Sequence, residues 1–429
     1  MALTRRQLLV SASAAAGAGA LSACGFATSD SGSTKDTLTF TTWGTESELA
    51  GFRTAISSFE KANSGMKVKL NAVPYEQMFT NIDAQIQAGN PPEVFRVPYY
   101  TFGAYAGAGQ LLDLGPHLPS GFSDRFTPQA WAAVQNRGKP FGVPHHTDTS
   151  VILYNKDALS AAGIDRVPTS LAEAWTWSEF EKVATTLRRS MPASKYPFAY
   201  NWQGNGVTRW LSWLFEADGR FLAEDLRTPA IDSDRGQEAV RFTQGFFPQR
   251  LVPPNSSVKS TTYAADLWYS ETVAMTFGGA FLLPDTAAAV DFEWGATYAP
   301  RNVRAGGDFG GNALVATKGA DPELAAAFFA HVTEAEQMRR FCAAASLLPT
   351  RADLVGEPID FKVRPELSEV FAGQASTVKP ADSGQVASPA MSKIITVLQD
   401  ELERAFLGGQ SVATTLDGLQ VGIGKAAAG

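Results

Sequence analysis

In this sequence of 429 residues, the thiol of Cys24 is the reactive group whose modification is indicated most clearly by the residues next to it. It is one of only two cysteines, and it directly follows Leu21-Ser22-Ala23. A thiol at this place can carry a diacylglyceryl group through a thioether bond, and the small residues before it fit the peptidase that cuts there. The four residues are similar to the bacterial lipobox, so we predict cleavage before Cys24 and a lipid anchor on its sulfur. The alternative is an ordinary export signal with a chance cysteine.

The residues ahead of Cys24 have the pattern of an export signal. Arg5 and Arg6 precede an alanine-rich apolar run from Leu8 to Ala23, which is shorter than the roughly 20 residues that span a bilayer. Adjacent arginines also suit twin-arginine export, and the sequence leaves this route and the Sec route both open. Residues 24–36 are small and polar and are predicted to form a flexible tether. We therefore expect the protein to be anchored to the outer face of the cell membrane.

The composition favours a globular protein and excludes some classes of partner. Apolar residues make up 45% of the chain and charged residues 18%, which is enough material for large cores. The net charge is −7 and no basic cluster follows the signal, so we expect no nucleic-acid partner. Four histidines and a single further cysteine, Cys342, argue against a metal site, and no motif calls for a cofactor.

Sequence motifs of catalytic chemistry are absent. The chain contains neither Gly-x-Ser-x-Gly nor His-Glu-x-x-His. A glycoside hydrolase needs two carboxylates at a fixed separation, and 43 acidic residues make chance pairs easy to find. We expect a protein that is not an enzyme and keep a secreted glycoside hydrolase as a less favoured alternative.

Hydrophobic periodicity predicts an α/β protein. Residues 38–43 alternate as in a strand, and Phe52, Ile56 and Phe59 then share one face of a helix. A second strand and a second helix follow in the same order, which favours a lobe with a mainly parallel sheet. The body of about 390 residues is too long for one ordinary domain and suits two.

Several stretches of the body, in their order along the chain, resemble the extracellular solute-binding proteins of ABC importers, in the sugar-binding, maltose-binding-like family. They are FGVPHHTDTSVILYNKDALSAAG, EADGRFL, ETVAMTFGGAF with YAPRN, GGNALVATKGADPELAAAFFAHVTEAEQMRRF, and LLPTRADL. The resemblance runs from about residue 38 to about residue 355. One departure is that Phe281 stands where the family often has a tryptophan.

The resemblance implies a two-lobed, periplasmic-binding-protein-like fold of type II, with a ligand cleft between lobes that are joined by several hinge crossings. It implies an N-terminal lobe of residues 37–146 plus 279–313 and a C-terminal lobe of residues 147–278 plus 314–429. Crossings are expected near residues 146–150, 276–279 and 311–315.

A sugar site needs flat aromatic surfaces and polar groups that bond hydroxyls, placed at the carboxyl ends of strands. The aromatic candidates are Trp43, Tyr99, Tyr100, Trp202, Trp213 and Phe281. The other candidates are His146, Asp148, Asn201, Gly279, Gly311, Asn312 and Arg351. Trp202 follows the strand PFAY in an open loop and is the favoured stacking surface. Core packing of the tryptophans and tyrosines, a capping or hinge bond of Asp148 and a surface ion pair of Arg351 stay open as alternatives.

The resemblance further implies a monomeric binding protein that captures a carbohydrate and delivers it to the permease subunits of an ABC transporter. Relatives with this fold bind glycerol phosphodiesters or other polyols, and the Gly-rich loops of this chain would suit a phosphate group. That second ligand class therefore stays open. The sequence names neither the sugar nor the permease.

Overall fold

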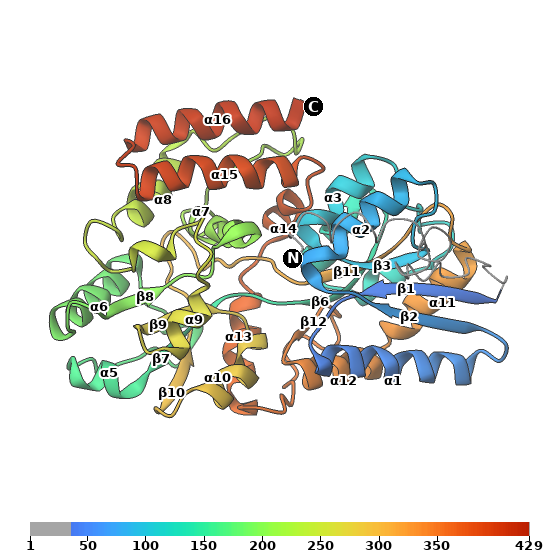
Figure 1. The fold of residues 1–429 in the computed structure, drawn as a ribbon, viewed down its shortest axis with the longest axis horizontal. Helices are drawn as coiled ribbons and strands as arrows, with labels where there is room; N and C mark the ends of the chain where they lie inside the picture. The colour runs from blue at the N-terminus through green and yellow to red at the C-terminus, as the bar shows by residue number, and fades with distance from the viewer. Residues whose placement is uncertain (1–35, 429) are drawn as a thin grey trace, which may run out of the picture. The chain divides into compact units, whose positions relative to one another are not determined.

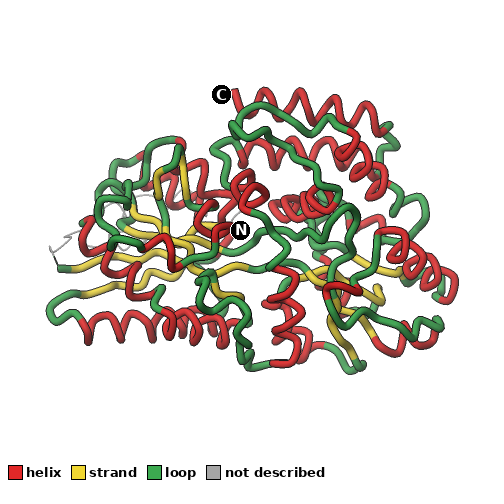
Figure 2. Tube along the Cα trace, turned by 180° about the vertical axis from the view of Figure 1, so that it is seen from behind, coloured by secondary structure: helices red, strands yellow, loops and turns green. Residues whose placement is uncertain are grey.

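The computed structural model of the protein describes residues 36–428. The predicted export signal, Cys24 and the tether up to residue 35 lie outside the described residues. Within residues 36–428 the strands form two larger sheets and one short hairpin, and helices pack around both sheets (Figures 1 and 2). The α/β class predicted from periodicity is confirmed.

The first sheet begins with the predicted strand–helix–strand–helix unit. Leu38 and Phe40 point into the core from the first strand, and Thr45 caps the helix that follows by accepting a hydrogen bond from the Glu48 amide. Phe52 and Phe59 are buried on that helix, as the periodicity predicts. In spatial order the sheet contains β12 (Leu348–Pro349), β6 (Val143–Thr147), β11 (Asn312–Ala316), β3 (Val94–Pro98), β1 (Thr37–Thr42) and β2 (Lys67–Ala72).

The direction of the strands in this sheet differs in part from the expectation of a mainly parallel arrangement. β1 is parallel to β2 and to β3, because each connection between them contains a helix. β11 is antiparallel to both β3 and β6, and β12 is antiparallel to β6. β11 and β12 belong to segments that come later in the chain and enter the sheet from the opposite end.

The second sheet has its own core and mixed strand directions. β7 is antiparallel to β9 and β10, and β8 is parallel to β9. In spatial order it contains β10 (Trp294–Thr297), β7 (Val151–Asn155), β9 (Val273–Gly278) and β8 (Tyr196–Ala199). The separate hairpin pairs β4 (Gln135–Asn136) with β5 (Lys139–Pro140).

Helices pack on both sheets, and the last two long helices lie side by side (Figure 1). Around the first sheet are α1 (Glu46–Ala62), α2 (Tyr75–Gln87), α3 (Tyr99–Gly107), α4 (Pro128–Ala132), α11 (Pro322–Val332) and α12 (Ala335–Ala345). The others are α5 (Lys156–Ala161), α6 (Trp177–Ser190), α7 (Leu211–Glu216), α8 (Asp234–Gln244), α9 (Ala264–Tyr269), α10 (Leu283–Ala289), α13 (Ser368–Ala375), α14 (Pro380–Val386), α15 (Met391–Phe406) and α16 (Val412–Ala428). Short 3₁₀ helices are η1 (Phe122–Arg125), η2 (Leu171–Glu173), η3 (Gly204–Trp210), η4 (Pro254–Ser256), η5 (Ala280–Leu282) and η6 (Pro365–Leu367).

The two sheets do not follow the expected lobe assignment, which placed residues 279–313 in the N-terminal lobe and residues 314–429 in the C-terminal lobe. β10 belongs to the second sheet, whereas β11 and β12 belong to the first. The chain therefore crosses between β6 and β7, between β10 and β11, and after β12, and the expected crossing at residues 276–279 is not one of these places. The two glycines there serve close packing instead: a Cβ on Gly278 would clash with Leu282, and one on Gly279 would lie 2.5 Å from the ring of Phe281.

The described part of the chain contains neither a metal cluster nor a membrane span. Between residues 36 and 428, no group of three or more His, Cys, Asp or Glu side chains is arranged to hold a metal ion. None of the helices in this range combines the length and apolar character that crossing a bilayer requires. Cys342 is buried on α12, as predicted, and burial raises the pKa of its thiol.

Candidate functional site

A cavity of about 390 Å³ lies between the two lobes and is lined by residues of both. It sits at the carboxyl ends of β1 and β3, which is where open α/β sheets bind ligands. The first lobe contributes Trp43, Gly44, Thr45, Glu48, Tyr75, Arg96 and Tyr100. The second contributes Thr208, Arg209, Phe215 and Phe281, and the crossings contribute His146, Asp148, Asp308, Phe309, Gly310, Gly311 and Asn312.

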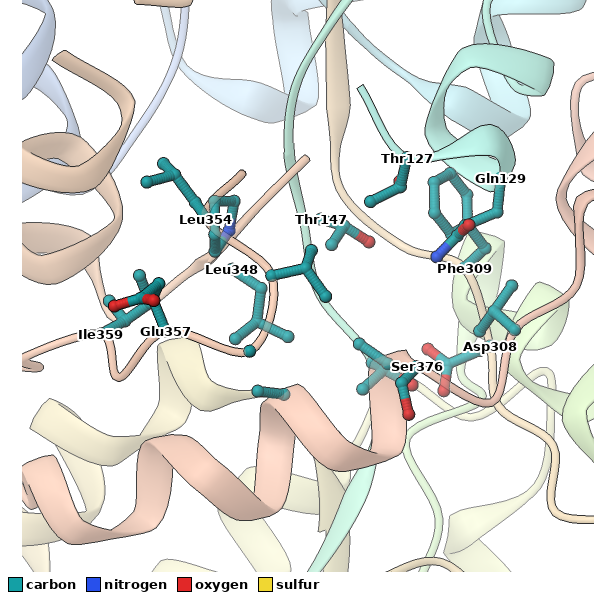
Figure 3. A pocket seen from close by; sticks show the side chains of 17 residues that line it. Thr127, Gln129, Thr147, Asp308, Phe309, Leu348, Leu354, Glu357, Ile359 and Ser376 are labelled. Carbon is teal, nitrogen blue, oxygen red and sulfur yellow. The ribbon is translucent and has the colours of Figure 1, made fainter. Parts of the chain in front are cut away.

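The first crossing is extended, so its side chains alternate between two cavities. His146 and Asp148 line the large cavity, whereas Thr147 and Thr149 line a smaller one of about 40 Å³. Figure 3 shows the smaller cavity, where Thr147 lies near Leu348 and the second crossing contributes Asp308 and Phe309. The two crossings therefore form a shared wall between both cavities.

The guanidinium of Arg209 joins both crossings to the second lobe. Its Nη2 lies 3.1 Å from Oδ2 of Asp148, and its Nε lies 3.4 Å from Oδ2 of Asp308. The other oxygen of Asp308 accepts a hydrogen bond of 2.8 Å from the Ser150 amide. Burial alone would lower the pKa of Arg209, but the two carboxylates raise it above its ordinary value, so the guanidinium stays charged. Burial raises the pKa of Asp308.

Two glycines leave the space that the carboxylate of Asp148 occupies. A Cβ on Gly279 would lie 3.1 Å from Oδ2 of Asp148, and one on Gly310 would clash with Oδ1. The amide of Gly310 also donates a hydrogen bond of 3.0 Å to the backbone oxygen of Asp148. Gly311 has a φ of +98° and a Cβ there would clash with the His146 carbonyl, so only glycine lets the two crossings approach this closely.

A buried hydrogen-bonded chain fixes the first-lobe side of the cavity. Nη2 of Arg96 lies 2.5 Å from Glu48 and 3.0 Å from Nε2 of His146, while Nδ2 of Asn312 lies 2.9 Å from the same Nε2. Because a guanidinium only donates, Nε2 is assigned as an acceptor and the proton of His146 as lying on Nδ1, 3.0 Å from Nδ1 of His145. Burial, Arg96 and His145 all lower the pKa of His146, so its ring is neutral.

The same chain orients the amide of Asn312. Its nitrogen faces His146, and its oxygen, which is buried, has no hydrogen-bond partner among residues 36–428. A buried acceptor without a partner is costly, by about 1–3 kcal/mol. An arriving hydroxyl donor would remove that cost.

Aromatic rings form the apolar walls of the cavity. The guanidinium of Arg96 covers the ring of Trp43 at 4.6 Å, and Tyr75 packs against the same indole with ring centroids 5.2 Å apart. The hydroxyls of Tyr75 and Tyr100 are 2.7 Å apart. Phe281 faces them from the second lobe. Arg96 covers one face of Trp43. The aromatic surface that is available to a ligand therefore comes from several rings and not from one tryptophan.

Seven of the thirteen predicted ligand-binding residues line this cavity. They are Trp43, Tyr100, His146, Asp148, Phe281, Gly311 and Asn312. The six others, which are Tyr99, Asn201, Trp202, Trp213, Gly279 and Arg351, lie outside its lining.

The structure places both second-lobe tryptophans of the predicted site in the core. Trp202 is fully buried, stacks on Tyr200 at 4.8 Å and donates a hydrogen bond of 2.6 Å to the backbone oxygen of Ser256. Trp213 is fully buried as well, on α7, and packs between Trp177 and Phe246. Neither indole has a surface left for stacking on a ligand, which departs from the role favoured for Trp202.

The remaining four residues lie outside the lining of the cavity. Tyr99 is buried and donates a hydrogen bond of 3.1 Å to the backbone oxygen of His146. Arg351 pairs with Asp353 at 2.7 Å, which is the ion-pair alternative for this residue. Gly279 supports Phe281 and Asp148 from behind, and Asn201 is half-buried at the end of β8.

Four charged residues of the cavity did not enter the sequence prediction: Glu48, Arg96, Arg209 and Asp308. Arg96 carried a usable signal, because an arginine inside the buried strand VFRVP requires a partner. Glu48 completes a capping box with Thr45, which explains it without reference to a ligand. Arg209 lies on η3 and Asp308 in a loop, and their approach to each other depends on the tertiary fold.

Comparisons with known proteins agree with this architecture. Residues 43–339 match the family model described as bacterial extracellular solute-binding protein. A galactooligosaccharide-binding protein of Bacillus subtilis (strain 168) is 27% identical over 218 residues, which are 49% of this chain and 48% of that protein. The curated relatives are matched over about a quarter to a half of their length.

Solved structures resemble nearly the whole described body. A cyclic alpha-maltosyl-1,6-maltose binding protein from Arthrobacter globiformis aligns with a TM-score of 0.77 at 18% identity, covering 91% of this chain and 98% of that one. UgpB from Mycobacterium tuberculosis, solved in complex with glycerophosphocholine, aligns with a TM-score of 0.73 at 20% identity, covering 90% and 97%. The fold is thus the two-lobed one of periplasmic sugar-binding proteins. The chain belongs to the family of bacterial extracellular solute-binding proteins.

Proposed function

We propose that this protein captures a carbohydrate in the cavity between its lobes and delivers it to the membrane permease of an ABC importer. The observation that carries the proposal is the lining of the cavity, in which aromatic rings from both lobes surround carboxylate and amide groups. Rings suit the apolar faces of sugars, and these polar groups suit hydroxyls. Binding closes the lobes because the ligand contacts both of them only in the closed state.

The arrangement of carboxylates supports binding and not hydrolysis. A glycoside hydrolase needs one carboxyl group to protonate the leaving oxygen and a second to attack or to activate water. Asp148 and Asp308 both contact the same guanidinium, that of Arg209. Sustained turnover of a panel of glycosides by the purified protein would contradict this reading.

A thermal-shift screen against oligosaccharides tests the proposal. A ligand at 100 times its dissociation constant stabilises the folded state by about 2.7 kcal/mol, which raises the melting temperature measurably. We expect at least one neutral oligosaccharide to do so. Phe281→Ala should weaken that binding at least tenfold, whereas Phe292→Ala, which removes a ring packed on Trp268 away from the cavity, should not. Stabilisation by no carbohydrate would refute the proposal.

We also propose that the lipid on Cys24 holds the protein near its permease. The sequence Leu21-Ser22-Ala23-Cys24 motivates this proposal. Cys24→Ala should move the protein from the membrane fraction to the medium or to the soluble extracytoplasmic fraction, with ligand affinity unchanged. Cell fractionation with metabolic palmitate labelling measures the release and the loss of the lipid, and calorimetric titration of a sugar ligand measures the affinity. Retention of the variant at the membrane would count against the anchor.

A further inference from the structure

The charged groups of the cavity are three acids and two arginines. Glu48, Asp148 and Asp308 line it together with Arg96 and Arg209. The ring of His146 adds no charge, because burial lowers its pKa. The lining therefore carries a net charge of about −1, counted with ordinary protonation states. An anionic ligand would enter a site whose field opposes it.

Neither guanidinium in the lining is open to an anion. Arg96 pairs with Glu48 at 2.5 Å and donates a hydrogen bond of 2.9 Å to the backbone oxygen of Trp43, and its side chain is only 3% exposed. Arg209 is 16% exposed, but Asp148 and Asp308 flank it from both crossings. A phosphate oxygen reaching Arg209 would meet two carboxylates that already hold it.

At two helix N-termini near the cavity, a backbone amide is already paired. The start of α1 would suit a phosphate, but the Glu48 carboxylate already accepts a hydrogen bond of 2.8 Å from the Thr45 amide. The amide of Tyr99, at the start of α3, donates to the backbone oxygen of Gly311 at 3.3 Å. Among residues 36–428, two buried polar atoms at this side have no hydrogen-bond partner. The Asn312 oxygen accepts hydrogen bonds and cannot bind a phosphate oxygen. Nε of Arg96 is a donor, but it belongs to a side chain that is only 3% exposed and already paired with Glu48.

We infer that Asp148 and Asp308 determine the specificity of the cavity by closing Arg209 to anions, so that the site takes an uncharged, hydroxyl-rich ligand and rejects phosphodiesters. The inference rests on the proposed function, since it concerns the ligand of the same cavity. It also separates the two ligand classes that the sequence leaves open. Hydroxyl groups can donate to the carboxylates without separating them from Arg209, whereas a phosphate group must compete with them.

The test is a gain of anion binding when one carboxylate is neutralised. Asp308→Asn keeps the shape of the side chain and leaves Asp148 to pair with Arg209. Asp148→Asn does the converse. Inorganic phosphate and glycerophosphocholine are titrated calorimetrically at low salt into the wild-type protein and each variant. We expect binding of inorganic phosphate to strengthen by at least about tenfold in the variants, because a full opposing charge is removed at close range. Glycerophosphocholine combines an anionic phosphodiester with a cationic choline, so its gain should have the same sign but be smaller. Asp353→Asn frees Arg351 outside the cavity and should give no such gain.

The outcomes are distinguishable from those of the sugar screen. Tight binding of glycerophosphocholine by the wild-type protein would overturn the inference while leaving a solute-binding role intact. Variants that melt like the wild-type protein but gain no anion affinity would overturn the role of the two carboxylates. If one variant fails to fold, the other and the wild-type titration still decide. Failure of every neutral oligosaccharide refutes the proposed carbohydrate function, whichever way the anion titrations turn out.

Discussion

Arg209→Met is expected to lower the free energy of unfolding by about 3–5 kcal/mol, because it leaves two buried carboxylates without their counter-charge. Asp148 and Asp308 are 6% and 5% exposed, so solvent cannot replace the guanidinium. The same change should abolish ligand binding, since both crossings lose their attachment to the second lobe. Urea unfolding followed by circular dichroism measures the loss of stability.

The pH dependence of that loss identifies its cause. Burial already raises the pKa of Asp308 above 3.8 in the presence of Arg209, and removing the cation raises it further. An acid whose pKa is raised in the folded state binds its proton more tightly when the protein is folded. Its contribution to the free energy of unfolding is therefore largest below pH 3.8 and falls as the pH rises through the raised pKa. The deficit of Arg209→Met should therefore shrink on acidification from neutral pH.

A surface arginine provides the matched control. Arg340→Met breaks an exposed ion pair with Glu336 on α12 and should cost less than about 1 kcal/mol, with little pH dependence of this kind. If Arg209→Met and Arg340→Met lowered the free energy of unfolding equally, the ion pairs of Arg209 in the cavity would stabilise the protein no more than an exposed ion pair does.

Trp202→Ala is expected to lower the free energy of unfolding by about 3–5 kcal/mol while leaving the ligand affinity of the folded protein unchanged. The indole is fully buried against Tyr200 and Phe406, and its loss leaves a cavity and an unpaired backbone oxygen on Ser256. Urea unfolding by circular dichroism and calorimetric titration of a sugar hit separate the two effects.

Trp202→Phe serves as the milder companion change. It retains most of the ring packing but still removes the donor to Ser256, so the loss should be smaller than for alanine. A large loss of sugar affinity in the folded Trp202→Phe protein would contradict the core role and restore the predicted stacking role.

Local patterns predicted the elements that build the lobes but not the partners that build the cavity. The alternation at Leu38 and Phe40 and the helical face of Phe52 and Phe59 depend only on neighbours in the chain, and both appear as expected. The strand order of the first sheet depends on β11, which arrives some two hundred residues after β3. Sequence periodicity carries no information about such a pairing.

The candidate site divides in the same way. Asp148 and Asn312 lie at crossings that the family resemblance implied, so their positions along the chain were enough to select them. Trp202 follows a strand in an apparently open loop, and only the return of Phe406 on α15 buries it. The role of Arg209 depends on its contacts with Asp148 and Asp308. These residues are 61 and 99 positions away in the sequence and come close to Arg209 only in the folded protein.

The attachment of both crossings to Arg209 also sets the pivot of the molecule. Asp148 and Asp308 are both paired with Arg209 of the second lobe, so we expect them to move with that lobe as one rigid body. Rotation then falls on the backbone just before Asp148 and on Gly310 and Gly311, where φ at the latter is +98°. We therefore expect the second-lobe half of the cavity to keep its shape when the lobes close, so that a solute would bind to it first and the first lobe would then close over the solute. The conformational entropy lost on binding would then come mainly from these few backbone torsions.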